Sequence, residues 1–307
     1  MFDESLITEI VSKLEVSEKY REFIMDKIKL IYNKIYQVLS DLRLESGKLY
    51  RAVTHLAYRG KLIRGLYCYL VSRALGADEQ SSLTLSASAE LYHMASLIHD
   101  DIIDKAEFRR GLESVHKKYG LEYAIIAGDT LIVYANYILS ELGGGVIKIL
   151  AEAGLKLADG EALEMDIDLP SNIDEYNKIV YLKTASFFEG LLKASAYIAG
   201  RIGLVDDLAS LGKYIGFCFQ YRDDVLDYIG ESNILGKPTG LDRYKPNLLT
   251  ILIHRYGYTL EDAIRVADEM IAKYIEKAVA ILNKIDINQY DKEVLTDLTR
   301  LLRVRVA

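Results

Sequence analysis

Apolar residues recur at helical spacing along almost the whole chain, and this periodicity limits the folds that the chain can adopt. Examples are Ile28, Ile31 and Ile35, and the longer stretches 87–98 and 179–198. Residues three or four positions apart lie on one face of a helix, whereas the alternating pattern of strands is nearly absent. The sequence therefore predicts an all-α bundle of about ten or more helices around a central cavity.

The composition and the positions of the helix breakers favour a single domain. The chain has 307 residues, half of them apolar, and is long enough to bury a sizeable core. No Pro/Ser-rich linker divides it, and Pro170, Pro238 and Pro246 fall at expected helix boundaries. We therefore expect residues 1–307 to form one domain. Thr259, followed closely by acidic residues, predicts the start of a further helix.

Charge and cysteine content exclude several classes of protein. The net charge is −7 with scattered basic residues, which argues against a general nucleic-acid binder. Cys68 and Cys218 are too few and too far apart for a disulfide framework or a zinc cluster. The N-terminus does not resemble a signal peptide, and no uninterrupted apolar stretch reaches the ~18 residues of a membrane span. We expect a cytoplasmic protein that does not span a membrane.

Two aspartate triads are the strongest functional pattern in the chain. They are Asp100, Asp101 and Asp104 in the first half, and Asp223, Asp224 and Asp227 in the second. On a helix the three acids of a triad crowd onto one face, where their charges repel unless a cation neutralises them. A single triad is usually a solvated acidic face, but both of these follow apolar stretches. Carboxylates with few soft ligands nearby suit Mg²⁺, which completes its shell with water and substrate phosphates.

Basic residues near the first triad have spacings that suit phosphate groups. Lys61 and Arg64 stand one helical turn apart, and Arg109 and Arg110 follow shortly after the first triad. Lys61 and Arg64, taken alone, are more often a solvated basic turn. Arg109 and Arg110 directly follow the triad, which favours their binding of the diphosphate that the metals bridge, or of a second one beside it. The segment 236–242 contains a lysine but lacks the spacing of a P-loop, which argues against an ordinary nucleotide site.

These elements, in this order, resemble the trans-isoprenyl diphosphate synthases, or polyprenyl synthetases, from about Gly60 to Asn247. The matching segments are Gly60-Lys61-Leu62-Ile63-Arg64, His99 to Asp104 with Arg109-Arg110-Gly111, Ala127-Gly128-Asp129, Lys183-Thr184, and Phe219 to Asp227. The resemblance implies an isoprenoid-synthase-type bundle and a Mg²⁺-dependent prenyltransferase. Such an enzyme ionises an allylic diphosphate, and the double bond of isopentenyl diphosphate attacks the carbocation head-to-tail. A homodimer is also expected.

The resemblance also implies roles for individual residues. The principal ligands of about three Mg²⁺ ions around the allylic diphosphate would be Asp100, Asp104 and Asp223. Direct or water-mediated ligands would be Asp101, Asp224 and Asp227. The cations that neutralise the leaving diphosphate would be Arg109, Lys183 and Lys237. Isopentenyl diphosphate would bind Gly60, Lys61, Arg64, His93 and Arg110. Thr184 and Gln220 would face the carbocation or the departing diphosphate, which is expected to take the proton itself.

The chain departs from the family pattern at three places. The family often has proline where this chain has Gly65, and a Gly-Gln pair where Gly160 and Glu161 stand. Both positions lie away from the predicted metal ligands, so we expect activity to survive these changes. Tyr244 replaces a common glycine before Lys245. That change weakens the case for Lys245 as a further diphosphate ligand.

The helix that leads into the first triad predicts the product length. Ser96, Ala95 and Tyr92 precede Asp100 by four, five and eight residues and lie on roughly the same face of the helix. Family members with short products have an aromatic residue at one of the first two positions. Here Tyr92 is the first bulky side chain, so we expect C20 to C25 products, or C30 if Tyr92 swings aside. The alternative is that Tyr92 only packs in the core and another helix sets the limit.

Competing functions remain at this level. A class I terpene cyclase shares the bundle and the first triad, but its second metal motif is usually of the NSE/DTE type. Squalene and phytoene synthases carry DxxxD-type motifs. A non-catalytic partner subunit of a prenyl synthase commonly loses one triad, whereas this chain keeps both. The paired triads therefore favour chain elongation over these alternatives.

Overall fold

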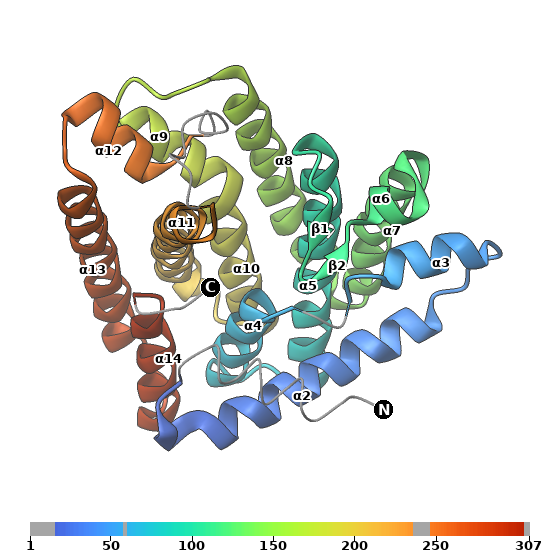
Figure 1. Cartoon of the computed structure of the whole chain (residues 1–307). Coiled ribbons are helices and arrows are strands. Elements are labelled where there is room, and N and C mark those ends of the chain that lie inside the picture. The colour runs from blue at the N-terminus through green and yellow to red at the C-terminus, as the bar shows by residue number, and fades with distance from the viewer. Residues whose placement is uncertain (1–15, 58–59, 236–245, 304–307) are drawn as a thin grey trace. The chain divides into compact units, whose positions relative to one another are not determined.

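The structure is a computed structural model that describes residues 16–57, 60–235 and 246–303 (Figure 1). Most of these residues, 81%, are helical. Strands in the described residues are limited to β1 (Phe108–Arg109) and β2 (Leu112–Glu113), which pair antiparallel. The described residues form more than ten α-helices, so the prediction of an all-α fold is confirmed.

The chain divides into two compact units. The first contains Ser17–Ile147, and the second contains Lys148–Tyr197 and Arg201–Ala307. Each unit carries one aspartate triad, because Asp100 lies in the first and Asp223 in the second. The expectation of a single domain stays a prediction.

The first unit is organised around α5 (Glu79–Ile103). Its other helices are α2 (Glu18–Asp41), α3 (Gly47–Thr54), α4 (Ile63–Ala74), α6 (Val115–Tyr119) and α7 (Leu121–Leu139). Helix α5 begins at Asp78, whose side chain accepts a hydrogen bond from the Ser81 amide at 2.9 Å. It packs against α2, α4 and α7 and buries most of its length. The first triad at its C-terminal end is therefore held by a rigid, buried helix.

Helix α7 has one buried face and one exposed apolar face. The exposed apolar side chains are Leu121, Ile125, Ile126, Val133 and Tyr137. By length and composition the segment Leu121–Leu142 is the one described helix that would suffice to cross a membrane, and 39% of the tested window is buried. The segment also contains Glu122, Asp129 and Glu141, so its apolar run is interrupted. A buried or interface helix passes the same test.

The second unit is organised around the long helix α11 (Val205–Leu235). Its other helices are α8 (Gly144–Asp166), which begins in the first unit, α9 (Ile173–Val180), α10 (Ser186–Ile198), α12 (Leu248–Tyr256), α13 (Leu260–Lys284) and α14 (Gln289–Leu301). Helix α11 packs against α12, α13 and a π-helical turn at Tyr181–Ala185. The Phe217 and Tyr274 rings stack with centroids 4.9 Å apart between α11 and α13. This packing fixes the helix that carries the second triad.

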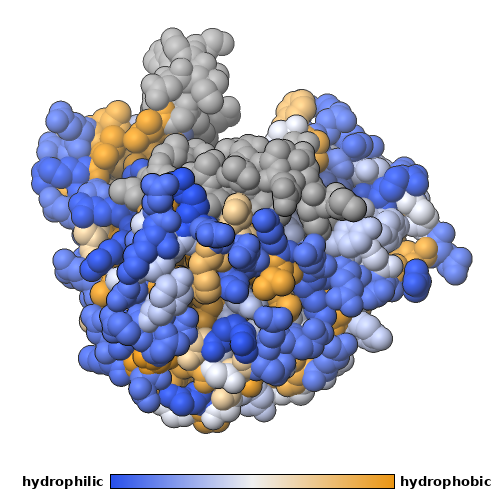
Figure 2. All heavy atoms as spheres, turned by 90° about the horizontal axis from the view of Figure 1, so that it is seen from below, coloured by the Kyte–Doolittle hydropathy of each residue, from blue (hydrophilic) through white to orange (hydrophobic). Residues whose placement is uncertain are grey.

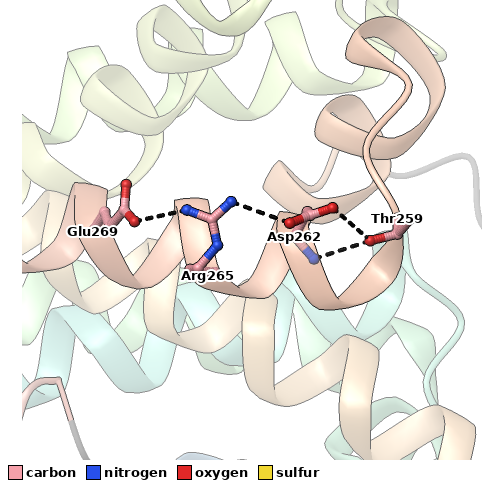
Figure 3. Close-up of polar contacts among 4 residues, drawn as sticks. All are labelled: Thr259, Asp262, Arg265 and Glu269. Atoms are coloured by element: carbon pink, nitrogen blue, oxygen red, sulfur yellow. Dashed lines mark hydrogen bonds and ion pairs between the residues drawn. The ribbon is translucent and has the colours of Figure 1, made fainter.

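The predicted helix start at Thr259 is confirmed. The Thr259 hydroxyl oxygen accepts from the Asp262 amide at 3.2 Å and donates to the Asp262 carboxylate at 2.9 Å (Figure 3). One turn further along, Arg265 bridges Asp262 and Glu269 on the exposed side of α13. These contacts satisfy the first turn of the helix, as the acidic residues after Thr259 predict.

Figure 2 shows one face of the molecule, and most of that face is hydrophilic. Hydrophobic residues on it form small, separated groups. This distribution is the usual one for a protein whose apolar residues are used mainly in its core.

Candidate active site

The first triad sits at the C-terminal end of α5. Asp101 is fully buried, and its Oδ1 accepts from Arg109 Nε at 2.7 Å and from Arg109 Nη2 at 2.6 Å. Asp101 Oδ2 is also buried and has no hydrogen-bond partner among the residues that the structure describes. Asp100 is half-buried and Asp104 is exposed. One oxygen of the triad is thus held by an arginine, and a second is buried without a protein donor.

Arg109 reaches Asp101 because it lies on a small hairpin that sequence reasoning missed. Strands β1 and β2 are joined by Arg110 and Gly111, both with positive φ (52° and 74°). Two successive positive φ values are typical of the tight turns that suit hairpin twist. The strands have two residues each, which is too short for an alternating pattern to appear in the sequence.

The same turn brings Arg110 against Gly60. Arg110 is largely buried, and its Nη1 donates to the Leu56 carbonyl at 3.2 Å. A Cβ at Gly60 would meet Arg110 Nη1 at 3.0 Å, so the glycine makes room for the guanidinium group. The Tyr32 hydroxyl donates to the Gly60 carbonyl from α2. Arg64 Nη1 lies 3.3 Å from His93 Nε2. The structure therefore places Gly60 beside Arg110 and Arg64 beside His93, all four being predicted ligands of isopentenyl diphosphate.

Glu90 is a buried acid beneath this cluster that sequence reasoning did not single out. Its Oε1 accepts from the Gly65 amide at 2.7 Å. Burial raises the pKa of Glu90, while the Gly65 amide and the charges of Arg64 and Arg110 oppose that rise. The side chain thus connects the start of α4 to the two arginines. An acid inside an apolar helical stretch was the pattern from which it could have been found.

Asp224 of the second triad is bonded to protein groups through both of its oxygens. Oδ2 accepts from the Tyr176 hydroxyl and, at 2.9 Å, from the Leu248 amide. Oδ1 accepts from Gln220 Nε2 at 3.0 Å. Burial, with a smaller contribution from the charge of Asp223, raises the pKa of Asp224 to about 7 against the opposing effect of these hydrogen bonds. Its described contacts tie α11 to α9 and to the start of α12.

The neighbours of Asp224 in the triad have different surroundings. Asp223 is half-buried and Asp227 is exposed. Their predicted metal-binding roles, like those of Asp100, Asp101, Asp104 and Asp224, stay predictions. Lys237 and Lys245 lie outside the described residues.

Lys183 lies on the π-helical turn and is held by two carboxylates of α8. Its ammonium group is ion-paired with Glu164 and, at 2.7 Å, with Glu161 Oε2. Burial alone would lower the pKa of Lys183, but the two glutamates outweigh burial and raise it. A Cβ at Gly160 would overlap the backbone of Lys183, so this glycine lets α8 approach the turn. The predicted diphosphate ligand is therefore charged and fixed before any substrate arrives.

The structure brings Thr184 and Gln220 together, while their roles toward the carbocation or the diphosphate stay predictions. Thr184 Oγ1 donates to Gln220 Oε1 at 2.8 Å, and Gln220 in turn donates to Asp224. A Cβ at Gly216 would overlap Ala185, so α11 approaches the π-helical turn through a glycine. The second unit thus joins the Lys183-Thr184 element to the second triad in one hydrogen-bonded chain.

The residues fit hard cations that are shared with a substrate. No group of three His, Cys, Asp or Glu side chains in the described part of the chain is arranged to hold a metal ion by itself. Mg²⁺ usually takes only one or two protein carboxylates and completes its shell with phosphate oxygens and water. The buried, unbonded Oδ2 of Asp101 is an oxygen donor of the kind that such a site uses.

An all-α fold in which each unit presents an aspartate triad beside arginine or lysine side chains defines an enzyme class that acts on diphosphates. The chain belongs to the polyprenyl synthetase family, because the profile of that family matches residues 46–285. It is therefore a prenyltransferase, and the family resemblance found in the sequence is confirmed.

Relatives and solved structures agree with this assignment. A short chain isoprenyl diphosphate synthase from Methanothermobacter thermautotrophicus is 30% identical, over 95% of this chain and 91% of that protein. A geranylgeranyl pyrophosphate synthetase from Geoglobus acetivorans superposes with a TM-score of 0.82 at 30% identity, over 92% of this chain and 99% of that one. A polyprenyl synthase from Caulobacter crescentus, solved with calcium and isoprenyl diphosphate, has a TM-score of 0.77 at 27% identity, covering 97% and 98%.

Proposed function

We propose that the chain is a Mg²⁺-dependent synthase that condenses isopentenyl diphosphate head-to-tail with allylic diphosphates to give all-trans C20 to C25 prenyl diphosphates. The observation that carries this proposal is the arrangement of Asp101: Arg109 holds one oxygen, and the other is buried with no donor from residues 16–57, 60–235 and 246–303. The calcium and isoprenyl diphosphate in the Caulobacter relative support a divalent cation and this substrate class.

In this proposal the protein neutralises and orients the leaving diphosphate. Bound metal, held by Asp100, Asp104 and Asp223, would supply charge neutralisation of the allylic diphosphate, about three ions being expected by family resemblance. Arg109 and Lys183 add fixed positive charges, which favour the developing negative charge as the allylic C–O bond breaks. Thr184 and Gln220, bonded to each other at 2.8 Å, present oriented dipoles beside Lys183.

The second substrate binds through the cluster around Gly60, and the reaction then needs no protein base. Arg64 and Arg110 provide planar donors for the diphosphate of isopentenyl diphosphate. Its double bond attacks the allylic carbocation, a C–C bond forms, and the proton lost from the new cation passes to the released diphosphate. None of the site residues that the structure describes is assigned the role of a general base in this reaction.

The exposed apolar face of α7 supports a homodimer. Five large apolar side chains on this one helix are between 45% and 68% exposed, and a second copy of the chain would cover them. A cytoplasmic protein that does not span a membrane is proposed on the same basis, since covering this face in a dimer removes the need for lipid. Sedimentation of the purified protein without detergent tests the dimer and the absence of a membrane span: a monomer would contradict the dimer, and aggregation would contradict both.

The function is tested by incubating the purified protein with labelled isopentenyl diphosphate, one allylic primer at a time, and MgCl₂. Chromatography of the dephosphorylated products should show C20 to C25 alcohols, and chelation of the metal should abolish them. Absence of labelled prenyl product with every primer would overturn the proposal. A hydrocarbon that forms from the primer alone would favour the cyclase alternative.

A further inference from the structure

We propose that Asn136 determines the product length by holding Tyr92 in place, an inference that rests on the proposed function. The Tyr92 hydroxyl donates to Asn136 Oδ1 at 2.8 Å. Tyr92 lies on α5, eight residues before Asp100, and Asn136 lies on α7 of the same unit. The bond therefore fixes the first bulky side chain below the triad to the neighbouring helix.

The amide of Asn136 is itself held in place. Its Nδ2 donates to the Ile132 carbonyl, one turn earlier on α7, at 3.0 Å. With the nitrogen bonded to its own helix, the oxygen is directed to Tyr92, and both ends of the amide are satisfied. The acceptor is therefore preorganised rather than recruited from solvent.

Tyr92 is suited to be the donor. The side chain is half-buried, and burial raises the pKa of Tyr92 to about 12, although the bond to Asn136 opposes the rise. The phenol stays protonated throughout the physiological range, so the anchor does not depend on pH. A hydroxyl withdrawn from water is costly to leave unpaired, which favours the bonded position of the ring.

The residues between Tyr92 and the triad on this face of α5 are too small to limit the length of the product. Ala95 is buried and lacks bulk, and the Ser96 hydroxyl donates back to the His93 carbonyl at 2.9 Å. A prenyl chain that grows along this face of α5 passes both before it meets the Tyr92 ring. The hydrogen bond to Asn136 keeps the Tyr92 ring in the path of the growing chain, and loss of this bond lets the ring rotate aside.

Removing the Tyr92 hydroxyl distinguishes two mechanisms. In one, the hydrogen bond to Asn136 holds the ring in the path of the chain, and in the other the bulk of the ring is sufficient. Tyr92→Phe keeps the ring and removes the hydroxyl that makes the bond. Asn136→Leu keeps a similar volume on α7 and removes the acceptor together with the bond to the Ile132 carbonyl. Each variant should raise the share of products longer by one or more isoprene units severalfold. Because both changes break the same bond, the double variant should lengthen the products no further than either single change.

A graded variant and a control bracket the test. Asn136→Asp keeps an acceptor of the same size for the Tyr92 hydroxyl but loses the donor to the Ile132 carbonyl, so it should lengthen the products less than Asn136→Leu. Thr130→Ala removes another hydroxyl from α7, one bonded at 2.7 Å to the Ile126 carbonyl, and should leave the products unchanged. Thermal unfolding of every variant reports whether the fold is intact, and Tyr92→Phe, which removes one atom, carries the test if Asn136→Leu does not fold.

The outcomes separate this inference from the proposed function. Longer products from Tyr92→Ala, with unchanged products from Tyr92→Phe and Asn136→Leu, would show that Tyr92 acts by bulk alone and would overturn the role of Asn136. Unchanged products from all three would place the limit elsewhere and overturn it too. Absence of any prenyl product from the wild-type protein would instead remove the proposed function.

Discussion

The hydroxyl of Tyr176 donates a hydrogen bond to the carboxylate of Asp224, and this bond joins α9 to the second aspartate triad. The same carboxylate receives the Leu248 amide at the start of α12 and the Gln220 side chain from its own helix. Two adjacent aspartates therefore face different surroundings: Asp224 is buried among protein donors, and Asp223 is half-buried. The triad combines a fixed support with side chains that remain nearer to solvent.

Asp224→Ala should destabilise the fold. The change leaves the Tyr176 hydroxyl and the Leu248 amide without their acceptor in a buried place, and such losses cost about 1–3 kcal/mol each. Urea unfolding measures the effect. Tyr176→Phe, which removes one donor of the three, should cost less than Asp224→Ala; an equal stability of all three proteins would contradict the supporting role.

Asp100→Ala and Asp223→Ala should act on turnover instead. We expect each to lower kcat by orders of magnitude at saturating Mg²⁺, because each removes a ligand of the predicted metal site. The fold should persist, since removing one of several mutually repelling carboxylates relieves repulsion. Steady-state kinetics and circular dichroism provide the two readouts. Turnover near the wild-type value in Asp100→Ala would show that the first triad does not bind a catalytic metal.

Arg64→Ala should weaken isopentenyl diphosphate much more than the allylic substrate. Arg64 lies against His93 at 3.3 Å, in the cluster predicted for the non-allylic diphosphate. A lost guanidinium removes charge-assisted hydrogen bonds, which contribute about 1.5–3 kcal/mol each, and so at least a tenfold rise in KM is expected. Kinetics with each substrate varied in turn provide the comparison. Equal weakening of both substrates would contradict the assignment.

Glu161→Gln should tighten the allylic diphosphate. Lys183 is paired with two glutamates, and removing the charge of one leaves more positive charge for the substrate while Glu164 still holds the lysine. We expect KM to fall by about fivefold at unchanged kcat, which corresponds to about 1 kcal/mol for one charge. Glu189→Gln is the matched control, because Glu189 pairs with Lys156 and Lys193 instead. A higher KM in Glu161→Gln would show that both carboxylates are needed to position Lys183.

Glu90 should make the stability of the protein depend on pH. Burial raises the pKa of Glu90 in the folded protein above its ordinary value of 4.5, so the folded state binds this proton more tightly than the unfolded chain. The contribution of this pKa shift to the free energy of unfolding is complete below pH 4.5 and is lost as the pH rises through the folded-state pKa of Glu90. Glu90→Gln removes the titration, so the stability of the wild-type protein relative to this variant should fall as the pH rises from 4.5 through the folded-state pKa of Glu90. A constant difference in urea unfolding would rule the effect out.

Local patterns predicted the helices and the candidate residues, because helical periodicity and caps depend on neighbours in the sequence. Thr259 illustrates this, since its partner Asp262 is three residues away. The contacts that define the site join distant positions instead. Glu90 meets Gly65 across 25 residues, and Tyr176 meets Asp224 across 48.

Charge pairing and the hairpin were beyond local patterns for related reasons. Family resemblance predicted that Lys183 neutralises the leaving diphosphate, and only the close approach of α8 reveals its pairing with Glu161 and Glu164. The hairpin depends on two positive φ values at Arg110 and Gly111, and arginine is not a residue that signals such a turn. Family resemblance supplied the roles of these residues, but it did not supply their contacts.

The hydrogen bond of the Gly65 amide limits which residues common in the family can be introduced into this protein. Many family members have proline at this position, so a consensus design would replace the glycine and count the exchange as safe. Proline has no N–H group, and here that group donates to the buried Glu90 carboxylate at 2.7 Å. Gly65→Pro would therefore leave an oxygen of the buried Glu90 carboxylate without its amide donor. A substitution taken from the family consensus at this position carries a cost here that depends on Glu90.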